Sequence, residues 1–119
     1  MNLSCHCGGV TLTLPYAPVE ITHCNCSLCA KTGFRGIYYR DREVRVTGAL
    51  APYVRMDIEQ PCMTQWHCPT CGIVTHWTLL DEWPFEGEPR PDRMGVNGRL
   101  LDPDFAASLP VKEVDGASW

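Results

Sequence analysis

Seven of the eight cysteines stand in three tight groups, and their spacing is the feature of this chain that could support chemistry. The groups are Cys5 with Cys7, then Cys24, Cys26 and Cys29, and finally Cys68 with Cys71. Thiols one or two residues apart form a tight turn that aims their sulfur atoms at one point. A metal ion needs that geometry, whereas a disulfide framework does not. The sequence therefore predicts a zinc protein.

The first and third groups together predict one closed zinc site. Cys5 and Cys7 supply two thiolates and Cys68 and Cys71 supply two more, which gives the four-thiolate shell of a structural zinc. A glycine follows each pair and allows the backbone to turn sharply. A long stretch of chain separates the pairs, so the ion would close a loop that is costly in entropy. We therefore expect the metal-free chain to be unfolded or molten.

The middle group predicts a second zinc with a different role. Cys24, Cys26 and Cys29 have no second pair nearby in the sequence, and three protein ligands with one open position are typical of catalytic zinc. Alternatively, all the cysteines share one cluster, or the fourth place is filled by one of four other side chains: Cys62, His23, His67 or His76. Cys62 is otherwise interpreted as a spare thiol.

The donor set indicates what this second zinc would do. Three thiolates donate strongly, so the ion would be a weak Lewis acid but would accept a fourth thiolate and keep it deprotonated. We expect the site to hold a substrate thiol as the nucleophile, beside a small carbonyl compound. No catalytic side chain outside this zinc site is assigned.

Composition limits the class of protein. An apolar share of 45% and a charged share of 20% are those of a soluble globule, and the length predicts a single zinc-binding domain over residues 1–119. The net charge of −4 argues against nucleic acid as a partner. No secretory signal or membrane span is recognisable, so we expect a cytoplasmic protein whose thiols stay reduced.

The pattern of residues predicts a mainly β fold: small antiparallel sheets stapled by zinc, with one or two short helical turns. Ten prolines and ten glycines favour short strands. Strands are expected over seven ranges: Val10–Leu14, Gly36–Arg40, Val44–Thr47, Tyr53–Met56, Thr64–His67, Ile73–Leu80 and Arg93–Asn97. The two that flank Cys68 and Cys71 resemble a zinc ribbon. Helical turns are expected from Ser27 and from Asp102.

Three segments resemble the family of glutathione-dependent formaldehyde-activating enzymes, to which the centromere protein V domain also belongs. The segments are Ser4–Val10, His23–Gly33 and Cys68–Gly72, and the likeness extends to about Asp102. The resemblance implies a β-tent fold, a structural zinc on the first and third cysteine groups, and a labile zinc on the middle group, near bound glutathione. It also implies an enzyme that joins glutathione to formaldehyde as S-hydroxymethylglutathione, a carbon–sulfur lyase in the reverse sense.

The leading interpretation is thus a zinc-dependent carbon–sulfur lyase-like enzyme that acts on an adduct of a small thiol, such as glutathione, with an aldehyde. Lys31, Arg35 or Arg55 could pair with a glutathione carboxylate, although solvated surface charge is their more ordinary role. Two alternatives remain. One is a non-catalytic zinc module that binds a protein through an exposed tryptophan: Trp66, Trp77 or Trp83. The other is a redox or metal-buffering protein.

Overall fold

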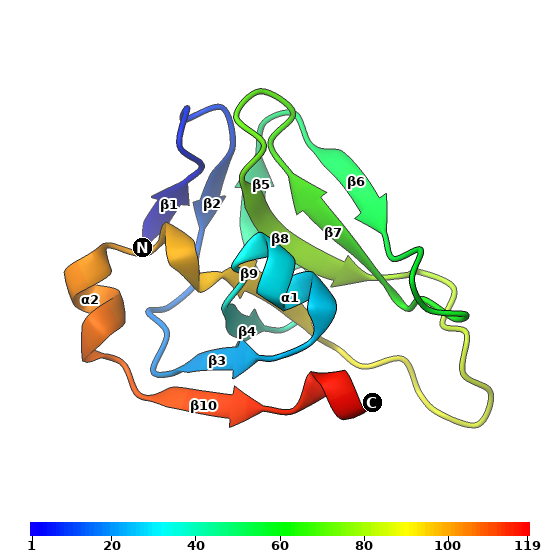
Figure 1. Cartoon of the computed structure of the whole chain (residues 1–119). Coiled ribbons are helices and arrows are strands. Elements are labelled where there is room, and N and C mark those ends of the chain that lie inside the picture. Colours follow the sequence, from blue (N-terminus) through cyan, green and yellow to red (C-terminus); the bar gives the residue numbers. More distant parts are fainter.

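The computed structural model describes residues 1–119 and confirms a mainly β protein with two sheets (Figure 1). The smaller sheet has the order β1-β2-β5 and the larger one the order β10-β3-β4-β9-β8-β7-β6. The strands are β1 (Asn2–Ser4), β2 (Thr11–Thr13), β3 (Ile21–Cys24), β4 (Gly36–Tyr39), β5 (Arg45–Thr47), β6 (Ala51–Val54), β7 (Met63–His67), β8 (Val74–Leu79), β9 (Met94–Asn97) and β10 (Val111–Val114).

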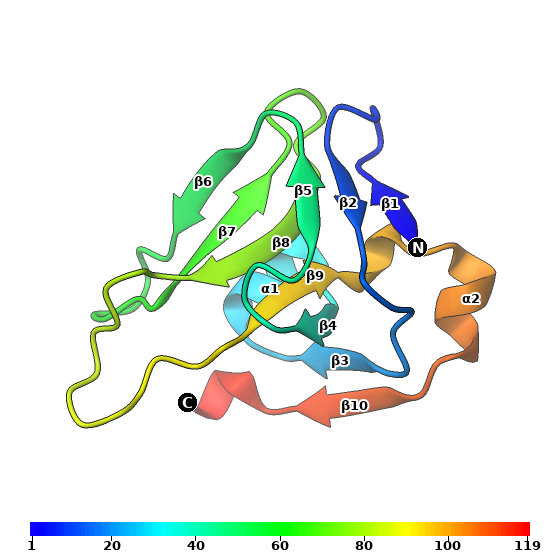
Figure 2. The same cartoon turned by 180° about the vertical axis from the view of Figure 1, so that it is seen from behind.

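The two sheets lean together like the sides of a tent, as expected for a β-tent fold. Seen from the front and from behind, strands β1, β2 and β5 rise on one side and β6, β7 and β8 on the other (Figures 1 and 2). The turn between β1 and β2 and the turn between β7 and β8 lie side by side at the top of both views. These are the turns that carry the first and third cysteine groups.

Both predicted helical turns are present, and their capping residues explain where they begin. Helix α1 spans Ser27–Thr32, and Cys26 caps it by accepting a hydrogen bond from the Cys29 amide. Helix α2 spans Pro103–Ser108, and the Asp102 carboxylate accepts from the Asp104 amide. Two 3₁₀ turns were not expected: η1 (Gly98–Leu100) and η2 (Gly116–Ser118). None of these helical segments combines the length and the apolar run that crossing a bilayer requires.

The strands that sequence patterning predicted are close to those observed. In β2, Leu12 is buried between the exposed Thr11 and Thr13, so the alternation reflects one face packed on the core. Strands β7 and β8 pair antiparallel on either side of the third cysteine turn, which gives the expected arrangement of strand, turn and strand. The strand expected to begin at Tyr53 starts at Ala51 instead, because Ala51 pairs with His67 of β7.

Three strands were not predicted, and one pairing corrects the expectation of purely antiparallel sheets. The three strands are β1, β3 and β10. Strand β10 pairs parallel to β3, with Val111 opposite Ile21. The partners of a parallel pair come from distant parts of the chain, so no local turn signal announces it.

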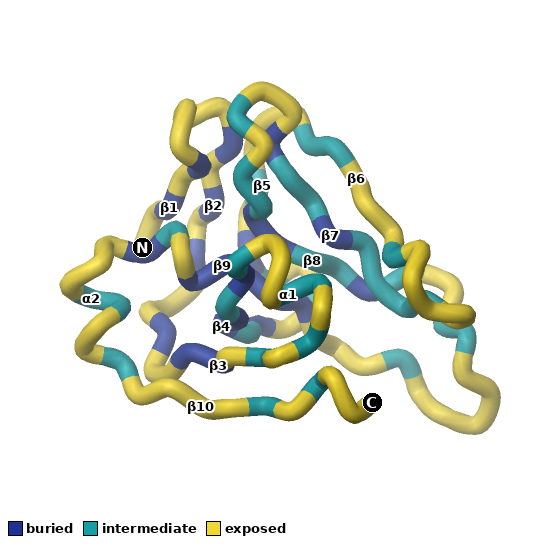
Figure 3. The backbone as a smooth tube through the Cα atoms, viewed as in Figure 1, coloured by how far each residue is buried: buried dark blue, intermediate teal, exposed yellow.

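The core lies where the two sheets meet, around strand β9 of the larger sheet. All four residues of β9 are buried, and the buried part of the tube concentrates at the centre of the molecule, around β9 and β4 (Figure 3). The apolar cluster consists of Leu3, Val10, Leu12, Leu14, Ile21, Ile37, Tyr39, Val44, Met94, Val96 and Leu101, together with Cys5 and Cys68. Cys5 and Cys68, which lie in the two cysteine turns at the top of the molecule, are therefore part of the core itself.

Candidate metal centres

The first and third cysteine groups meet at the apex of the tent. The Sγ atoms of Cys5, Cys7, Cys68 and Cys71 all lie within 4.8 Å of one another. Cys5 Sγ lies 3.7 Å from Cys7 Sγ, and Cys7 Sγ lies 3.6 Å from Cys68 Sγ. With zinc–sulfur bonds of about 2.3 Å, tetrahedral ligands lie about 3.8 Å apart. The two sulfur–sulfur distances match that value, and the four sulfurs converge closely enough to hold one tetrahedral metal ion.

The backbone around the apex supports ionised sulfur. The Val10 amide lies 3.3 Å from Cys5 Sγ and the Gly9 amide lies 3.4 Å from Cys7 Sγ, both as donors. The glycines that follow each pair, Gly8 and Gly72, have φ values of +79° and +77°, which side chains other than glycine rarely adopt. These turns aim amide N–H groups at the thiolates, as in structural metal sites.

Without a cation the four thiols of the apex cannot all ionise. The Cys7 amide favours the Cys71 thiolate and lowers the pKa of Cys71 to about 6. The Gly9 amide likewise favours the Cys7 thiolate, but the sulfurs of Cys68 and Cys5 outweigh it and raise the pKa of Cys7 to about 11. At neutral pH the Cys7 thiol therefore stays protonated and hydrogen-bonded to its neighbouring sulfurs, and a bound dication would favour its thiolate instead.

The middle group forms a second cluster at the junction of β3 and α1. Cys24 ends β3, Cys26 caps α1 and Cys29 lies in its first turn, and their Sγ atoms lie within 4.8 Å of one another. Burial disfavours the Cys26 thiolate, but the Cys29 amide and neighbouring groups outweigh it and lower the pKa of Cys26. Burial, reinforced by the Cys26 sulfur, raises the pKa of Cys29.

No fourth histidine, cysteine or carboxylate joins the middle cluster, and the two clusters are separate. The four side chains considered as a fourth ligand lie elsewhere. His23 pairs with Glu113 at 2.8 Å, and His76 is buried with its Nδ1 2.8 Å from the Thr75 hydroxyl. Cys62 and His67 belong to neither cluster. The second cluster thus offers three sulfurs and leaves further coordination to a non-protein group.

A C-terminal segment covers the second cluster, and no local pattern in the sequence indicates this contact. Strand β10 runs beside β3. The turn η2 that follows is hydrogen-bonded to Asn25, which lies between Cys24 and Cys26 in the sequence. Asn25 donates to Asp115 and accepts from the Ala117 amide, both at 2.9 Å. Gly116 packs so closely on Cys24 that an added methyl group would collide with the sulfur. This close approach requires glycine.

A hollow of about 240 Å³ lies beside the second cluster: its lining includes Val114, which pairs with Cys24 across β10 and β3. Its lining also includes Tyr38, Arg93, Lys112 and Trp119, and the Arg93 guanidinium stands 3.9 Å from the centre of the Tyr38 ring. Burial raises the pKa of the Tyr38 phenol, and the nearby thiols of the cluster add to this rise. The hollow therefore combines two cations and one carboxylate, Glu20, with the protonated phenol of Tyr38.

The cations and tryptophans singled out in the sequence have varied environments. Arg55 makes a bidentate pair with Asp57 and contacts the Ser27 hydroxyl, whereas Lys31 is exposed and Arg35 lines a different cavity. Trp66, Trp77 and Trp83 are partly buried. The indole of Trp66 donates to Thr78, so this tryptophan is packed into the sheet rather than presented as an anchor.

Comparison with known proteins agrees with this geometry. The model of a family described as glutathione-dependent formaldehyde-activating enzyme matches residues 1–90, which hold every cysteine of the chain. A crystal structure of a Rhodobacter sphaeroides protein from a structural genomics programme superposes with a TM-score of 0.67 at 28% sequence identity, and the alignment covers 94% of this chain and 100% of that one. No curated protein matches the chain.

Proposed function

Because the chain belongs to the family of glutathione-dependent formaldehyde-activating enzymes, we propose that it is a zinc-dependent enzyme that adds a small thiol to formaldehyde or a similar aldehyde. In the reverse direction it acts as a carbon–sulfur lyase on the adduct. The observation that carries the proposal is the second cluster: three convergent sulfurs with no fourth protein donor, next to a hollow whose lining holds two cations, Arg93 and Lys112, and one acid, Glu20.

Zinc is the metal that these donors suit. Four thiolates at tetrahedral spacing fit a structural zinc at Cys5, Cys7, Cys68 and Cys71, and three thiolates with an open position fit a second zinc at the middle cluster. When bound there, zinc supplies a positive charge that keeps an incoming thiol deprotonated near neutral pH. The protein's own part is to hold the three sulfurs in place through β3, the α1 cap and the C-terminal segment.

The hollow beside the second cluster supports a thiol that carries carboxylates. Arg93 and Lys112 line it, and neither takes part in any of the ion pairs of the molecule. Glutathione has two carboxylates, which these cations would bind. The Tyr38 phenol is protonated at neutral pH, and burial raises its pKa further, so it can donate a hydrogen bond to a substrate oxygen. Glutathione is therefore the thiol that we propose.

The proposed reaction needs no oxidant. The sulfur–hydrogen bond of the thiol breaks, sulfur bonds to the carbonyl carbon, and the proton ends on the former carbonyl oxygen as a hydroxyl group. Cleavage of the adduct returns the same proton to sulfur. The groups that we assign to the protein are thus cations to bind the thiol's carboxylates and a hydrogen-bond donor for the oxygen.

Exchange NMR with ¹³C-formaldehyde and glutathione tests the proposal. The zinc-loaded protein is expected to accelerate exchange between free formaldehyde and the adduct well beyond the spontaneous rate. The Cys26→Ser variant should lose this acceleration and the Cys62→Ser variant, whose thiol lies in neither cluster, should keep it. A rate no faster than the spontaneous addition would refute the enzyme.

Metal or redox buffering is a second candidate function, because the three thiols of the second cluster are only partly buried and can be reached by oxidants. Reversible loss of one zinc on mild oxidation, with the fold retained and no catalysed exchange, would favour it. For either function we propose one zinc-binding domain over residues 1–119, working in the reducing cytoplasm, where such thiols remain free to bind metal.

A further inference from the structure

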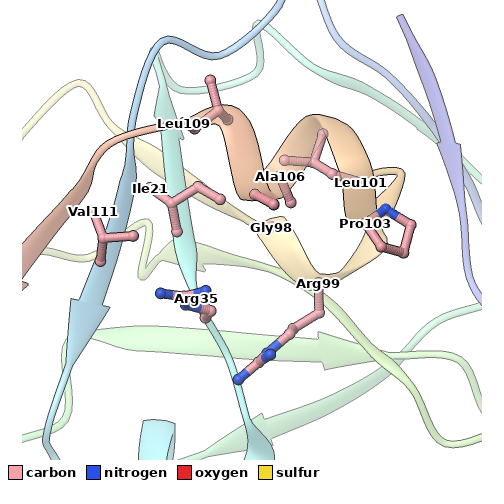
Figure 4. Close-up of a pocket in the computed structure, with 10 residues that line it drawn as sticks. Ile21, Arg35, Gly98, Arg99, Leu101, Pro103, Ala106, Leu109 and Val111 are labelled. Atoms are coloured by element: carbon pink, nitrogen blue, oxygen red, sulfur yellow. The ribbon is translucent and has the colours of Figure 1, made fainter.

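A second cavity, of about 310 Å³, lies away from both cysteine clusters. It opens between the start of β3, the start of β10, the turn η1 and helix α2, and its walls are mostly apolar: Ile21, Leu101, Pro103, Ala106, Leu109 and Val111. Figure 4 shows these side chains surrounding the space. This volume is at the lower end for ligand pockets, so an occupant would be small.

Two arginines approach this apolar cavity, and neither has an acidic partner. Arg35 and Arg99 line it, on the side away from Ala106 and Leu109 (Figure 4), and neither belongs to any of the ion pairs of the molecule. The Arg35 Nε atom is buried and has no hydrogen-bond partner, which costs free energy unless a ligand satisfies it. Arg99 Nε donates to the Gly33 carbonyl at 2.9 Å, which leaves its terminal nitrogens available.

Asn97 fixes the backbone of Arg35 and Arg99 relative to each other. Its side-chain oxygen accepts from the Arg99 amide at 3.0 Å and from the Arg35 amide at 3.5 Å, and its side-chain nitrogen donates to the Val74 carbonyl at 2.8 Å. Asn97 is only 3% exposed, so this network is shielded from water. The backbone of both arginines is therefore preorganised, which reduces the entropy lost when a ligand binds.

We propose that this cavity is a binding site for a small aliphatic carboxylate, whose acid group pairs with Arg35 and Arg99 and whose chain packs on the apolar wall. A guanidinium matches the planar carboxylate with two parallel hydrogen bonds. In a protein of net charge −4, two unpaired arginines beside an apolar hollow are the charge complement of such a ligand. An amine or an alcohol of the same length lacks that complement.

The site is distinct from the proposed thiol site. This cavity and the hollow of the proposed thiol site share no lining residue. Ile21 and Cys24 lie three residues apart on β3, so their side chains leave opposite faces of the strand. Of the ten lining residues only Ile21 and Arg35 precede residue 90, where the match to the family model ends. The cavity therefore depends mostly on the part of this chain beyond that match.

Titration of the zinc-loaded, ¹⁵N-labelled protein with hexanoate tests the proposal, with hexylammonium and hexanol as matched probes. Hexanoate is expected to saturate with a dissociation constant on the order of millimolar and to shift the amides of Gly98 and Ala106. The two other probes should bind at least tenfold more weakly. No thiol or aldehyde is used, so the outcome is independent of the proposed reaction.

Variants then assign the recognition to the two arginines. Arg35→Met and Arg99→Met should each weaken hexanoate binding by tenfold or more, whereas Lys31→Met, which removes an exposed cation outside the cavity, should leave it unchanged. If a variant does not fold, the comparison of the three probes on the unaltered protein still decides. Failure of hexanoate to saturate, equal binding of hexanol, or shifts centred on Cys24 to Cys29 would overturn the proposal.

Discussion

The Sγ atoms of Cys7 and Cys68 lie 3.6 Å apart, although 61 residues separate them along the chain. Cys7 belongs to the turn after β1 and Cys68 to the turn after β7, so this contact joins the smaller sheet to the larger one. Cys68 and the neighbouring Cys5 are also part of the apolar core. A metal bound here would therefore fix the relative position of the two sheets.

Loss of the metal at the apex is expected to unfold the domain. Structural zinc contributes about 10–16 kcal/mol in small peptides, as much as the whole stability of a typical domain, which is about 5–15 kcal/mol. We predict that Cys71→Ser, which removes one apex ligand, abolishes the cooperative thermal transition seen by circular dichroism.

The matched control is Cys62→Ser, because the Cys62 thiol lies in neither cluster. This variant should melt within a few degrees of the unaltered protein. A cooperative melt of Cys71→Ser, or of the fully chelated chain, would show that the apex metal is dispensable for folding.

The second cluster is expected to bind metal without supporting the fold. Cys26→Ser should release one of two zinc equivalents, lower the rate of adduct exchange to the spontaneous level, and leave the thermal transition in place. With cobalt in place of zinc, added thiol should change the visible spectrum of the unaltered protein but not that of the variant. An unfolded Cys26→Ser protein would assign this cluster a structural role instead.

The sequence predicted the two clusters because cysteine spacing reports local geometry directly. The same reasoning predicted β2 from the alternation around Leu12 and helix α2 from the capping Asp102. The pairing of the first cysteine group with the third rested instead on the ligand count, two thiolates from each. For β2, for α2 and for each cysteine turn the signal lies within a few residues, where backbone sterics and a single side chain decide the conformation. Such features can be derived without knowledge of the rest of the chain.

Features that depend on distant segments were not predictable in this way. Nothing near Val111 indicates that it pairs with Ile21, and nothing near Gly116 indicates that Cys24 lies against it. Arg35 was interpreted as a surface cation, whereas its Nε atom is buried beside an apolar cavity formed by later residues. These contacts are fixed by tertiary packing, which overrides local patterns.

His76 is expected to make stability depend on pH. Burial lowers the pKa of His76 from 6.5 to about 4, so between these values the unfolded chain binds a proton that the folded chain does not. Stability should be complete above pH 6.5, fall as the pH drops toward 4, and lose about 3 kcal/mol in total from this group. Urea denaturation of the unaltered protein and of His76→Gln over this range measures the difference.

Loss of zinc in acid affects both proteins alike, so the difference between their slopes isolates His76. Between pH 6.5 and 4, His76→Gln should lose about 3 kcal/mol less stability than the unaltered protein. Equal slopes for the two proteins would contradict the burial of a neutral imidazole beside Thr75.

Gly116 is expected to be essential for the C-terminal segment, β10 and η2, to pack over the second cluster. Because a methyl group here would collide with the Cys24 sulfur, Gly116→Ala should weaken the second metal at least tenfold in a chelator competition and expose the amides of β10 to hydrogen exchange. Gly87→Ala is the control: it has open space but a φ of +78°, so it should cost about 1–2 kcal/mol without changing metal affinity. Retained affinity and protection in Gly116→Ala would contradict the packing.

Elemental analysis of protein purified without chelators, combined with its hydrodynamic radius, tests the central claim most directly. The account predicts two equivalents of zinc per chain in a compact protein, falling to one in Cys26→Ser. A chain that is equally compact while containing no transition metal would contradict it, because the sulfurs of both clusters would then converge for some other reason.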